Sequence, residues 1–266
     1  MQALATSAAE AYERLAPYYD ELTREHDYEA WTRHLEAAAL RLGLSGKTLL
    51  DAACGTGKSF LPFLRRGYAV TACDISAEMV ALAAAKAPEA ELFVADVREV
   101  GKVGRFDLIT CLDDSLNYLT GDGDLEAALR SLGDNLAPAG VLVFDLNTLS
   151  TYRTTFARDM TLDGDGLVLA WRGGCDAGAE AGCLAELTVE AFADTGTGLY
   201  ERVVTRHVQR HHPRREVERA LAGAGLVATA VLGLLPDGSL DPRPSDEHHH
   251  KLVYFVQRVA KGGDSP

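Results

Sequence analysis

The residues with the clearest chemical potential lie in one segment, Thr48-Leu49-Leu50-Asp51-Ala52-Ala53-Cys54-Gly55-Thr56-Gly57-Lys58-Ser59. An apolar run enters a turn of small residues there, and a helical pattern follows. Gly55 and Gly57 carry no Cβ, so such a turn can bend sharply and let a ligand approach the backbone. The segment therefore predicts a buried parallel strand, a tight ligand-binding loop and the start of a helix.

Two ligand classes that use such a turn fit these residues poorly. A phosphate-binding P-loop ends as Gly57-Lys58-Ser59 does, but it needs another glycine where Ala52 stands. The carboxylate of Asp51 would also repel phosphates. A dinucleotide-binding turn that began at Gly55 would need glycine at its sixth position, where the large Phe60 stands.

Two more acidic residues end the next apolar segments. The pattern of 69–76 predicts a second strand that ends at Asp74, 17 residues after Gly57 (74 − 57 = 17). That distance accommodates one helix and a return strand, and it suits a carboxylate that binds ribose hydroxyls. The pattern of 90–97 predicts a third strand with Asp96 at its end.

These three segments resemble the motifs of class I S-adenosylmethionine (SAM)-dependent methyltransferases, which begin with an acid, small residues and Gly-x-Gly. The resemblance implies SAM as cofactor and S-adenosylhomocysteine as product. It also implies that Asp74 binds the ribose and that Asp96 faces the adenine amino group. The other residues that the resemblance assigns to the cofactor are Tyr19, Asp51, Ala53, Gly55, Gly57, Ile75, Met79, Val97 and Leu112.

The segment after the predicted fourth strand, Asp113-Asp114-Ser115-Leu116-Asn117-Tyr118-Leu119, is expected beside the transferring methyl group, because ligands lie beyond the carboxyl ends of such strands. It lacks the Asn/Asp-Pro-Pro-Tyr/Phe box typical of enzymes that methylate bases and glutamines. It resembles an Asp-Ser-x-Asn-Tyr variant of bacterial small-molecule methyltransferases, including enzymes for amino-sugar nitrogens. Tyr12, Tyr118 and Asp114 are the candidates for orienting the acceptor, and none of them is an unambiguous base.

The elements that must position these residues predict an α/β fold. The resemblance implies a seven-stranded Rossmann-like methyltransferase sheet with helices on both faces and an antiparallel last strand. Residues 167–172, 183–193 and 200–212 alternate apolar and polar side chains, which predicts a small inserted antiparallel β-sheet that covers the site. The predicted divisions are an N-terminal helical cap (1–45) with a break at Pro17, a SAM-binding core (46–150), the inserted lid (151–212) and a C-terminal completion of the sheet (213–266).

Composition narrows the function classes. The net charge of −13 argues against unaided binding to nucleic acid or to an anionic membrane. No apolar run has the length of a membrane span, Met1–Glu10 lacks the features of a signal peptide, and five cysteines without a Cys-x-x-Cys pair favour reduced thiols in the cytoplasm. His248-His249-His250 is interpreted as a native loop, and no metal is expected. His207, His211 and His212 are expected at a solvated rim, or alternatively as a base or substrate contact.

The predicted function is therefore SAM-dependent transfer of a methyl group to a nitrogen, or to an oxygen, of a small molecule such as a bacterial secondary metabolite or amino sugar. Two alternatives stay open. One is a P-loop-like nucleotide-binding protein, with Lys58 on phosphate and Asp113 on Mg²⁺, and the other is a non-catalytic scaffold with the SAM fold. The inserted sheet could also pair across a homodimer axis.

Overall fold

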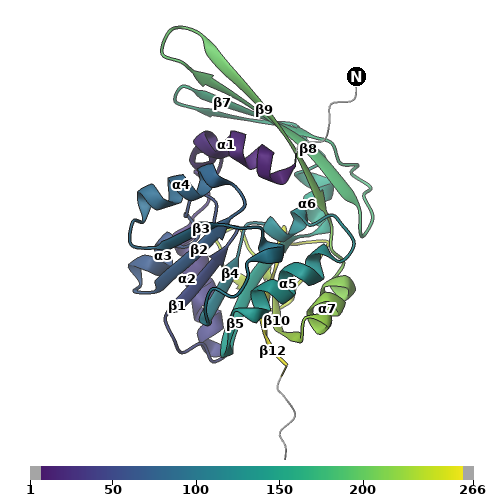
Figure 1. Cartoon of the computed structure of the whole chain (residues 1–266). Helices are drawn as coiled ribbons and strands as arrows, with labels where there is room; N and C mark the ends of the chain where they lie inside the picture. Colours follow the sequence, from purple (N-terminus) through teal and green to yellow (C-terminus); the bar gives the residue numbers. More distant parts are fainter. Residues whose placement is uncertain (1–6, 260–266) are drawn as a thin grey trace, which may run out of the picture.

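The computed structural model describes residues 7–259, and its centre is an eight-stranded sheet flanked by helices (Figure 1). The strands follow the order β11-β10-β12-β5-β4-β1-β2-β3. The pairs among β1 to β5 are parallel, and β12 is antiparallel to both β5 and β10. The strands are β1 (Thr48–Ala52), β2 (Ala69–Asp74), β3 (Glu91–Val94), β4 (Phe106–Cys111), β5 (Leu136–Asn147), β10 (Leu226–Leu234), β11 (Leu240–Asp241) and β12 (Lys251–Arg258). The predicted α/β sheet with an antiparallel last strand is confirmed, and the short β11 adds an eighth strand at its edge.

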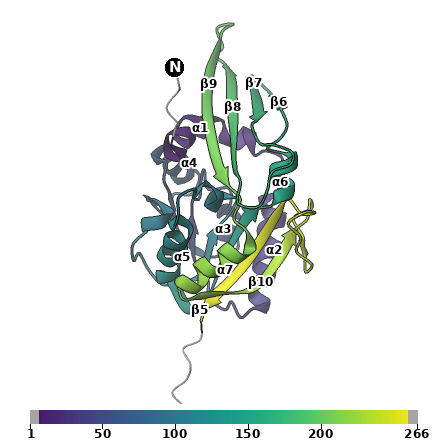
Figure 2. The ribbon, with the colours of Figure 1, turned by 90° about the vertical axis from the view of Figure 1, so that its right-hand side faces the viewer.

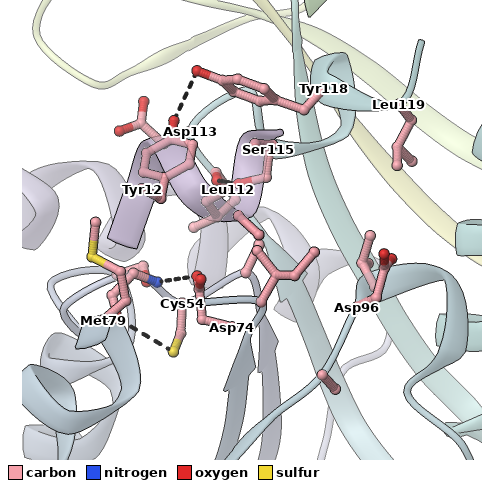
Figure 3. A pocket seen from close by; sticks show the side chains of 18 of the residues that line it. Tyr12, Cys54, Asp74, Met79, Asp96, Leu112, Asp113, Ser115, Tyr118 and Leu119 are labelled. Atoms are coloured by element: carbon pink, nitrogen blue, oxygen red, sulfur yellow. Dashed lines mark hydrogen bonds between the residues drawn. The ribbon is translucent and has the colours of Figure 1, made fainter. Parts of the chain in front are cut away.

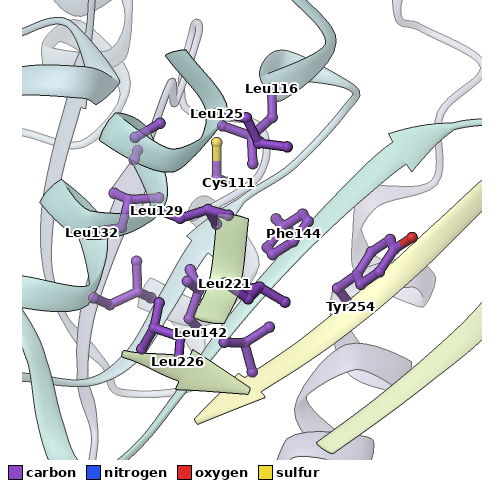
Figure 4. Packing of buried hydrophobic residues seen from close by; sticks show 14 of the residues in the cluster. Cys111, Leu116, Leu125, Leu129, Leu132, Leu142, Phe144, Leu221, Leu226 and Tyr254 are labelled. Carbon is purple, nitrogen blue, oxygen red and sulfur yellow. The ribbon is translucent and has the colours of Figure 1, made fainter. Parts of the chain in front are cut away.

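Successive side chains along each strand point to opposite faces, and helices bury both faces. Helices α5 (Asp124–Asp134) and α7 (Arg214–Gly223) cover one face, where Figure 4 shows Leu129 and Leu221 packed near Phe144. Helices α2 (Tyr28–Arg41), α3 (Leu61–Arg65) and α4 (Ala77–Lys86) cover the other. The two cores hold the strands rigidly, so the loops at their carboxyl ends have a fixed base.

A second sheet of four antiparallel strands stands over the carboxyl ends of the first (Figure 2). Its strands are β6 (Met160–Gly164), β7 (Leu167–Gly173), β8 (Leu184–Asp194) and β9 (Tyr200–Arg210), and α6 (Leu149–Thr154) leads into it. We call this sheet the lid. It confirms the predicted inserted sheet, although β6 and α6 were not expected from the sequence pattern. Helix α1 (Ala8–Leu22) lies between the lid and the main sheet and packs against both β9 and α4 (Figures 1 and 2).

The predicted break at Pro17 is wrong. Pro17 lies exposed inside α1, and a capping box at Ser7 and Glu10 fixes the start of that helix, so one lost backbone hydrogen bond does not end it. The chain leaves the helix at Thr23, and Asp27 caps α2. The helix expected after the glycine turn begins only at Leu61, because turns occupy most of the segment before that residue.

Strand β5 contains an irregularity near its start. The segment 138–140 lies within the strand, and the irregularity lets Phe106 pair with Leu136 and Leu108 pair with Val141. The boundaries proposed at residues 45, 150 and 212 stay predictions. Residues 1–6 and 260–266, which the first and last of those divisions include, lie outside the described residues.

Candidate active site

A cavity of about 280 Å³ lies where β1, β2, β3 and β4 end, beneath the first half of α1. We call it the strand-end cavity. Its floor is the turn after β1, where Ala53 and Gly55 both have positive φ, 56° and 53°. Residues other than glycine rarely adopt this left-handed backbone conformation. Alanine has a small side chain, so Ala53 adopts it at a lower energetic cost than a bulky residue would. The turn thereby exposes backbone to whatever occupies the cavity.

Most predicted site residues line the strand-end cavity, several of them shown in Figure 3. They come from the ends of four strands, from α4 and from α1. These residues are Tyr12, Tyr19, Ala53, Gly55, Asp74, Ile75, Met79, Asp96, Val97, Leu112 and Tyr118. The sequence motifs thus converge on one cavity, as the strand order requires.

Asp74 is held rigidly at the edge of this cavity. One carboxylate oxygen accepts a hydrogen bond from the Gly55 backbone N–H at 2.8 Å, and the other accepts from the Ser76 N–H at 2.9 Å. Burial raises the pKa of Asp74, while these two backbone donors work in the opposite direction. The carboxylate therefore has a fixed position from which its remaining lone pairs can accept hydrogen bonds.

Asp96 occupies a different environment. Its oxygens accept from the backbone N–H and the guanidinium of Arg98, and the hydrogen bond from that side chain is the main cause of its lowered pKa. Arg98 also contacts Asp124 at 3.1 Å across the cavity wall. Asp96 therefore stays ionised and able to accept hydrogen bonds from a ligand.

Two predicted cofactor residues do not line the cavity. The Asp51 side chain is completely buried and accepts hydrogen bonds from Ser59 and Thr110, each at 2.5 Å. Gly57 has a φ of 90°, and a Cβ there would lie 2.8 Å from the Phe60 ring. Both residues shape the loop from beneath the cavity, and their assignment to the cofactor stays a prediction.

The buried carboxyl of Asp51 predicts a pH-dependent stability difference. Burial raises the pKa of Asp51 to about 6, above the unfolded value of about 4. The stability that this group contributes is therefore present below about pH 4 and lost as the pH rises through about 6. Asp51→Asn cannot ionise, so its free energy of unfolding should improve relative to the native protein between pH 4.5 and pH 7.5 in urea titrations. Asp165→Asn, on an exposed turn, is the control, and its free energy of unfolding should differ from that of the native protein by the same amount at every pH. The same constant difference in Asp51→Asn would contradict the prediction.

Helix α1 is fastened over the glycine loop by polar contacts. The Thr56 hydroxyl donates to Asp20 at 2.6 Å, and Lys58 Nζ donates to the backbone oxygen of Thr23 at 2.8 Å and to its hydroxyl at 2.9 Å. Lys58 thus binds near the C-terminal end of α1, where a cation is favourable. This arrangement commits Lys58 to the helix and leaves it poorly suited to the phosphate role considered in the P-loop alternative.

A second cavity, of about 320 Å³, lies under the lid, and we call it the lid cavity. It shares Tyr12, Tyr19, Asp113 and Tyr118 with the strand-end cavity, so these four residues form the boundary between the two spaces. Asp114, the third predicted catalytic residue, lines the lid cavity but not the strand-end cavity. A ligand in each cavity would meet the other at this boundary.

A cluster of charges forms the base of the lid cavity. Lys251 Nζ lies 2.7 Å from Asp113, 2.5 Å from Asp114 and 3.1 Å from Asp145. The backbone N–H groups of Asp113 and Asp114, both in the left-handed region, donate to the two oxygens of Asp145. The buried Asp145 thus stabilises a strained turn that presents two further carboxylates.

The protonation of this cluster follows from burial and pairing. Burial alone would lower the pKa of Lys251, but the three carboxylates raise it well above its ordinary value. Burial opposes ionisation of Asp113, yet Lys251 holds its pKa far below the usual range. Burial raises the pKa of Asp145 to about 6 despite Lys251. At pH 7 Asp113 is therefore ionised and Lys251 is protonated.

A chain of hydrogen bonds crosses the boundary between the cavities. The Tyr12 hydroxyl donates to the Tyr118 hydroxyl at 2.9 Å, and the Tyr118 oxygen lies 3.0 Å from Nδ1 of His207. The other ring nitrogen of His207 lies 3.0 Å from the Thr205 hydroxyl. His207 is only 3% exposed, which excludes the solvated rim expected for it, and burial lowers its pKa to about 4. The imidazole is therefore neutral at pH 7.

His211 and His212 have structural surroundings, whereas His26 and His250 line the lid cavity. His211 and His212 are buried away from the boundary, and His211 contacts Asp246 at 3.2 Å. The segment 248–250 forms the loop before β12, as expected, and its His249 is buried. Within residues 7–259 no group of three or more histidine, cysteine or acidic side chains could hold a metal ion. The same range contains no helix long and apolar enough to cross a membrane.

Three residues of the site were missed by sequence reasoning. Asp145 and Lys251 lie at the ends of β5 and β12, and Gln209, on β9, donates to Asp114 at 2.5 Å. Asp145 follows an apolar strand just as the motif acids do, so it carried a usable signal. Lys251 and Gln209 carried none, because their roles depend on how distant segments pair.

Comparisons with known proteins agree with this geometry. A family model described as a methyltransferase domain matches residues 49–140. YqeM of Bacillus subtilis (strain 168) is 32% identical to this chain over 219 residues, which cover 80% of this chain and 85% of YqeM. Its name provisionally describes a methyltransferase and gives no substrate. The dTDP-3-amino-3,6-dideoxy-alpha-D-glucopyranose N,N-dimethyltransferase of Streptomyces fradiae is 33% identical over 119 residues, 45% of this chain and about half (47%) of that enzyme.

Solved structures share the fold over nearly the whole chain. A SAM-dependent methyltransferase from Clostridium acetobutylicum ATCC 824 superposes with a TM-score of 0.78 at 24% identity and covers 93% of this chain and 98% of its own. Streptomyces venezuelae DesVI superposes with a TM-score of 0.69 at 24% identity, and the match covers 94% of this chain and 99% of DesVI. The extent of the match to YqeM, together with the fold and the converging motifs, shows that this chain belongs to the class I SAM-dependent methyltransferases.

Proposed function

We propose that the protein is an N-methyltransferase of a small-molecule amine, with SAM in the strand-end cavity and the amine in the lid cavity. The observation that carries this proposal is the shared boundary of the two cavities at Tyr12, Tyr19, Asp113 and Tyr118. Two substrates that meet at this boundary react as if within one molecule, and this positioning is the largest contribution that such a reaction needs from the protein.

The residues of the strand-end cavity suit the parts of SAM. The Asp74 carboxylate has lone pairs free to accept hydrogen bonds from two ribose hydroxyls. The Asp96 carboxylate and the backbone of Val97 are placed to hydrogen-bond the edge of the adenine ring. Met79 and Leu112 are buried and apolar, and they offer surfaces for the adenine ring. When bound, SAM supplies a sulfonium methyl group that requires no further activation. The chain then has to orient the acceptor and exclude water.

Nitrogen is favoured over oxygen because the potential bases nearest the boundary between the cavities, His207 and Asp114, already have hydrogen-bond partners. His26 and His250 also line the lid cavity, where they lie beside Asp113 and Thr151. A hydroxyl acceptor needs a base within hydrogen-bond reach, whereas a neutral amine attacks without one. Both ring nitrogens of His207 already have hydroxyl partners, and the carboxylate of Asp114 is bound by Lys251 and Gln209. We therefore assign Tyr118 and Tyr12 to orienting the amine.

A matched pair of acceptors tests the proposal. A primary amine and the alcohol with the same carbon skeleton are each incubated with the protein and methyl-labelled SAM, and products are identified by mass spectrometry. Label in the N-methyl product is expected, and label only in the ether would overturn N-methylation.

Tyr118→Phe tests the orienting role in the same assay. The variant loses the hydroxyl that joins Tyr12 to His207, so kcat should fall about tenfold to a hundredfold, with SAM affinity and the pH profile unchanged. Tyr200→Phe, which changes a 60% exposed tyrosine on the lid, is the control. A changed pH profile in Tyr118→Phe would indicate proton transfer instead of orientation.

A further inference from the structure

We infer that the natural acceptor is a phosphate-free amine that binds as a cation and carries an apolar body. This inference rests on the proposed function and narrows its substrate class. It comes from the walls of the lid cavity, which differ sharply in chemistry from one end to the other. One end holds the charged cluster of Asp113, Asp114, Asp145 and Lys251, and the other is apolar.

The apolar end is built from three elements. Leu187 and Val189 of β8 point inward with the other odd-numbered residues of that strand, and they are 3% and 2% exposed. Helix α1 contributes Leu15 and Leu22, and the chain before β6 contributes Phe156. Burial of apolar surface stabilises a complex by roughly 25 cal/mol per Å². These walls therefore favour an aliphatic or aromatic body over a fully hydroxylated sugar.

The charged end attracts a cation. Three acidic side chains surround the single ammonium of Lys251, and all four groups are at least four-fifths buried. Water screens such charges poorly, so the excess of acidic side chains acts strongly on a ligand in the cavity. Asp113 belongs to the boundary between the two cavities, so an ammonium bound beside it lies close to the methyl donor. The ammonium must first release a proton to solvent. The nitrogen lone pair would then form the N–C bond to the methyl carbon as the S–C bond of the sulfonium breaks, and the thioether S-adenosylhomocysteine would leave.

A phosphate finds no unpaired lysine or arginine among the described residues of this cavity. Among the described residues that line it there is no arginine, and its one lysine is bound to three carboxylates. The lid arginines Arg202 and Arg206 lie on the opposite, solvent face of β9, where they pair with Glu190 and Glu186. The Streptomyces fradiae relative is named for a dTDP-linked sugar. We infer that this chain differs from it in refusing a diphosphate-bearing acceptor.

The test is calorimetric titration of acceptors into the protein saturated with S-adenosylhomocysteine, which requires no turnover. The probes are an arylalkyl primary amine with a phenol group, its alcohol isostere, the phosphate ester of the same phenol, and a dTDP-amino sugar. The free amine should bind at least tenfold more tightly than each of the other three. Equal or tighter binding of either phosphorylated probe, or no binding of the amine, would overturn the inference.

Asp114→Asn adds a test of the charge itself. Removal of one negative charge should weaken amine binding about tenfold and leave the alcohol isostere unchanged, whereas a general loss of packing would weaken both. Asp165→Asn, the same change on the exposed turn between β6 and β7, is the matched control. If a dTDP-amino sugar binds and is N-methylated while free amines are ignored, this inference fails and the N-methyltransferase proposal stands. If the protein methylates only oxygen acceptors, the N-methyltransferase proposal itself fails.

Discussion

Asp74→Asn is expected to weaken SAM binding by at least a hundredfold. Each hydrogen bond between a ribose hydroxyl and the carboxylate is a charged one, worth about 1.5–3 kcal/mol, and every 1.4 kcal/mol corresponds to a factor of ten in affinity. The amide of asparagine also cannot accept from both Gly55 and Ser76 as the carboxylate does. The floor of the strand-end cavity would therefore lose its anchor together with a direct contact.

Calorimetric titration with SAM measures this effect, and thermal unfolding shows whether the variant remains folded. Asp165→Asn should bind SAM as the native protein does. Unchanged SAM affinity in a folded Asp74→Asn protein would show that the ribose does not bind where the motif and the geometry place it.

Lys251→Met is expected to lower the free energy of unfolding by about 3–5 kcal/mol, because removing one partner of a buried ion pair leaves the other charge uncompensated. Here three carboxylates would lose their shared cation at once. A loss of this size is a large part of the 5–15 kcal/mol that typically stabilises a folded protein. The strained turn at Asp113 and Asp114 would be the first part of the site to rearrange.

Urea titration measures the loss, and Lys102→Met, which removes an exposed lysine, is the control. The double variant Lys251→Met, Asp114→Asn should recover part of the lost stability, since it buries one unpaired charge fewer. A Lys251→Met protein as stable as the control variant would mean that the cluster is not held together by this lysine.

The sequence carried most of the information about the cofactor cavity. Strand ends such as Asp74 and Asp96 are predictable because an apolar strand, a loop and a helix recur with regular spacing, and their ends must meet at one edge of a parallel sheet. Asp51 shows the limit of such patterns. A motif position fixes where a side chain begins, but only the packing of Ser59 and Thr110 decides that this carboxylate points away from the cavity.

The acceptor side was predictable only in outline. Alternation of side chains along β8 and β9 indicated a sheet and placed His207 on it, yet nothing local indicated that this histidine would be buried against Tyr118. The cluster around Lys251 joins residues more than a hundred positions apart. Contacts of this kind depend on the final pairing of β12 with β5, which no local pattern specifies.

The central claim is that SAM binds in the strand-end cavity, and isothermal titration of the purified protein tests it most directly. SAM, S-adenosylhomocysteine and Mg-ATP are titrated separately under the same conditions. The structure predicts micromolar or tighter binding of the first two and no heat of binding from Mg-ATP, since Lys58 is committed to the end of α1. Binding of Mg-ATP without SAM would contradict the assignment of Asp74 and Asp96, and the proposed function with it.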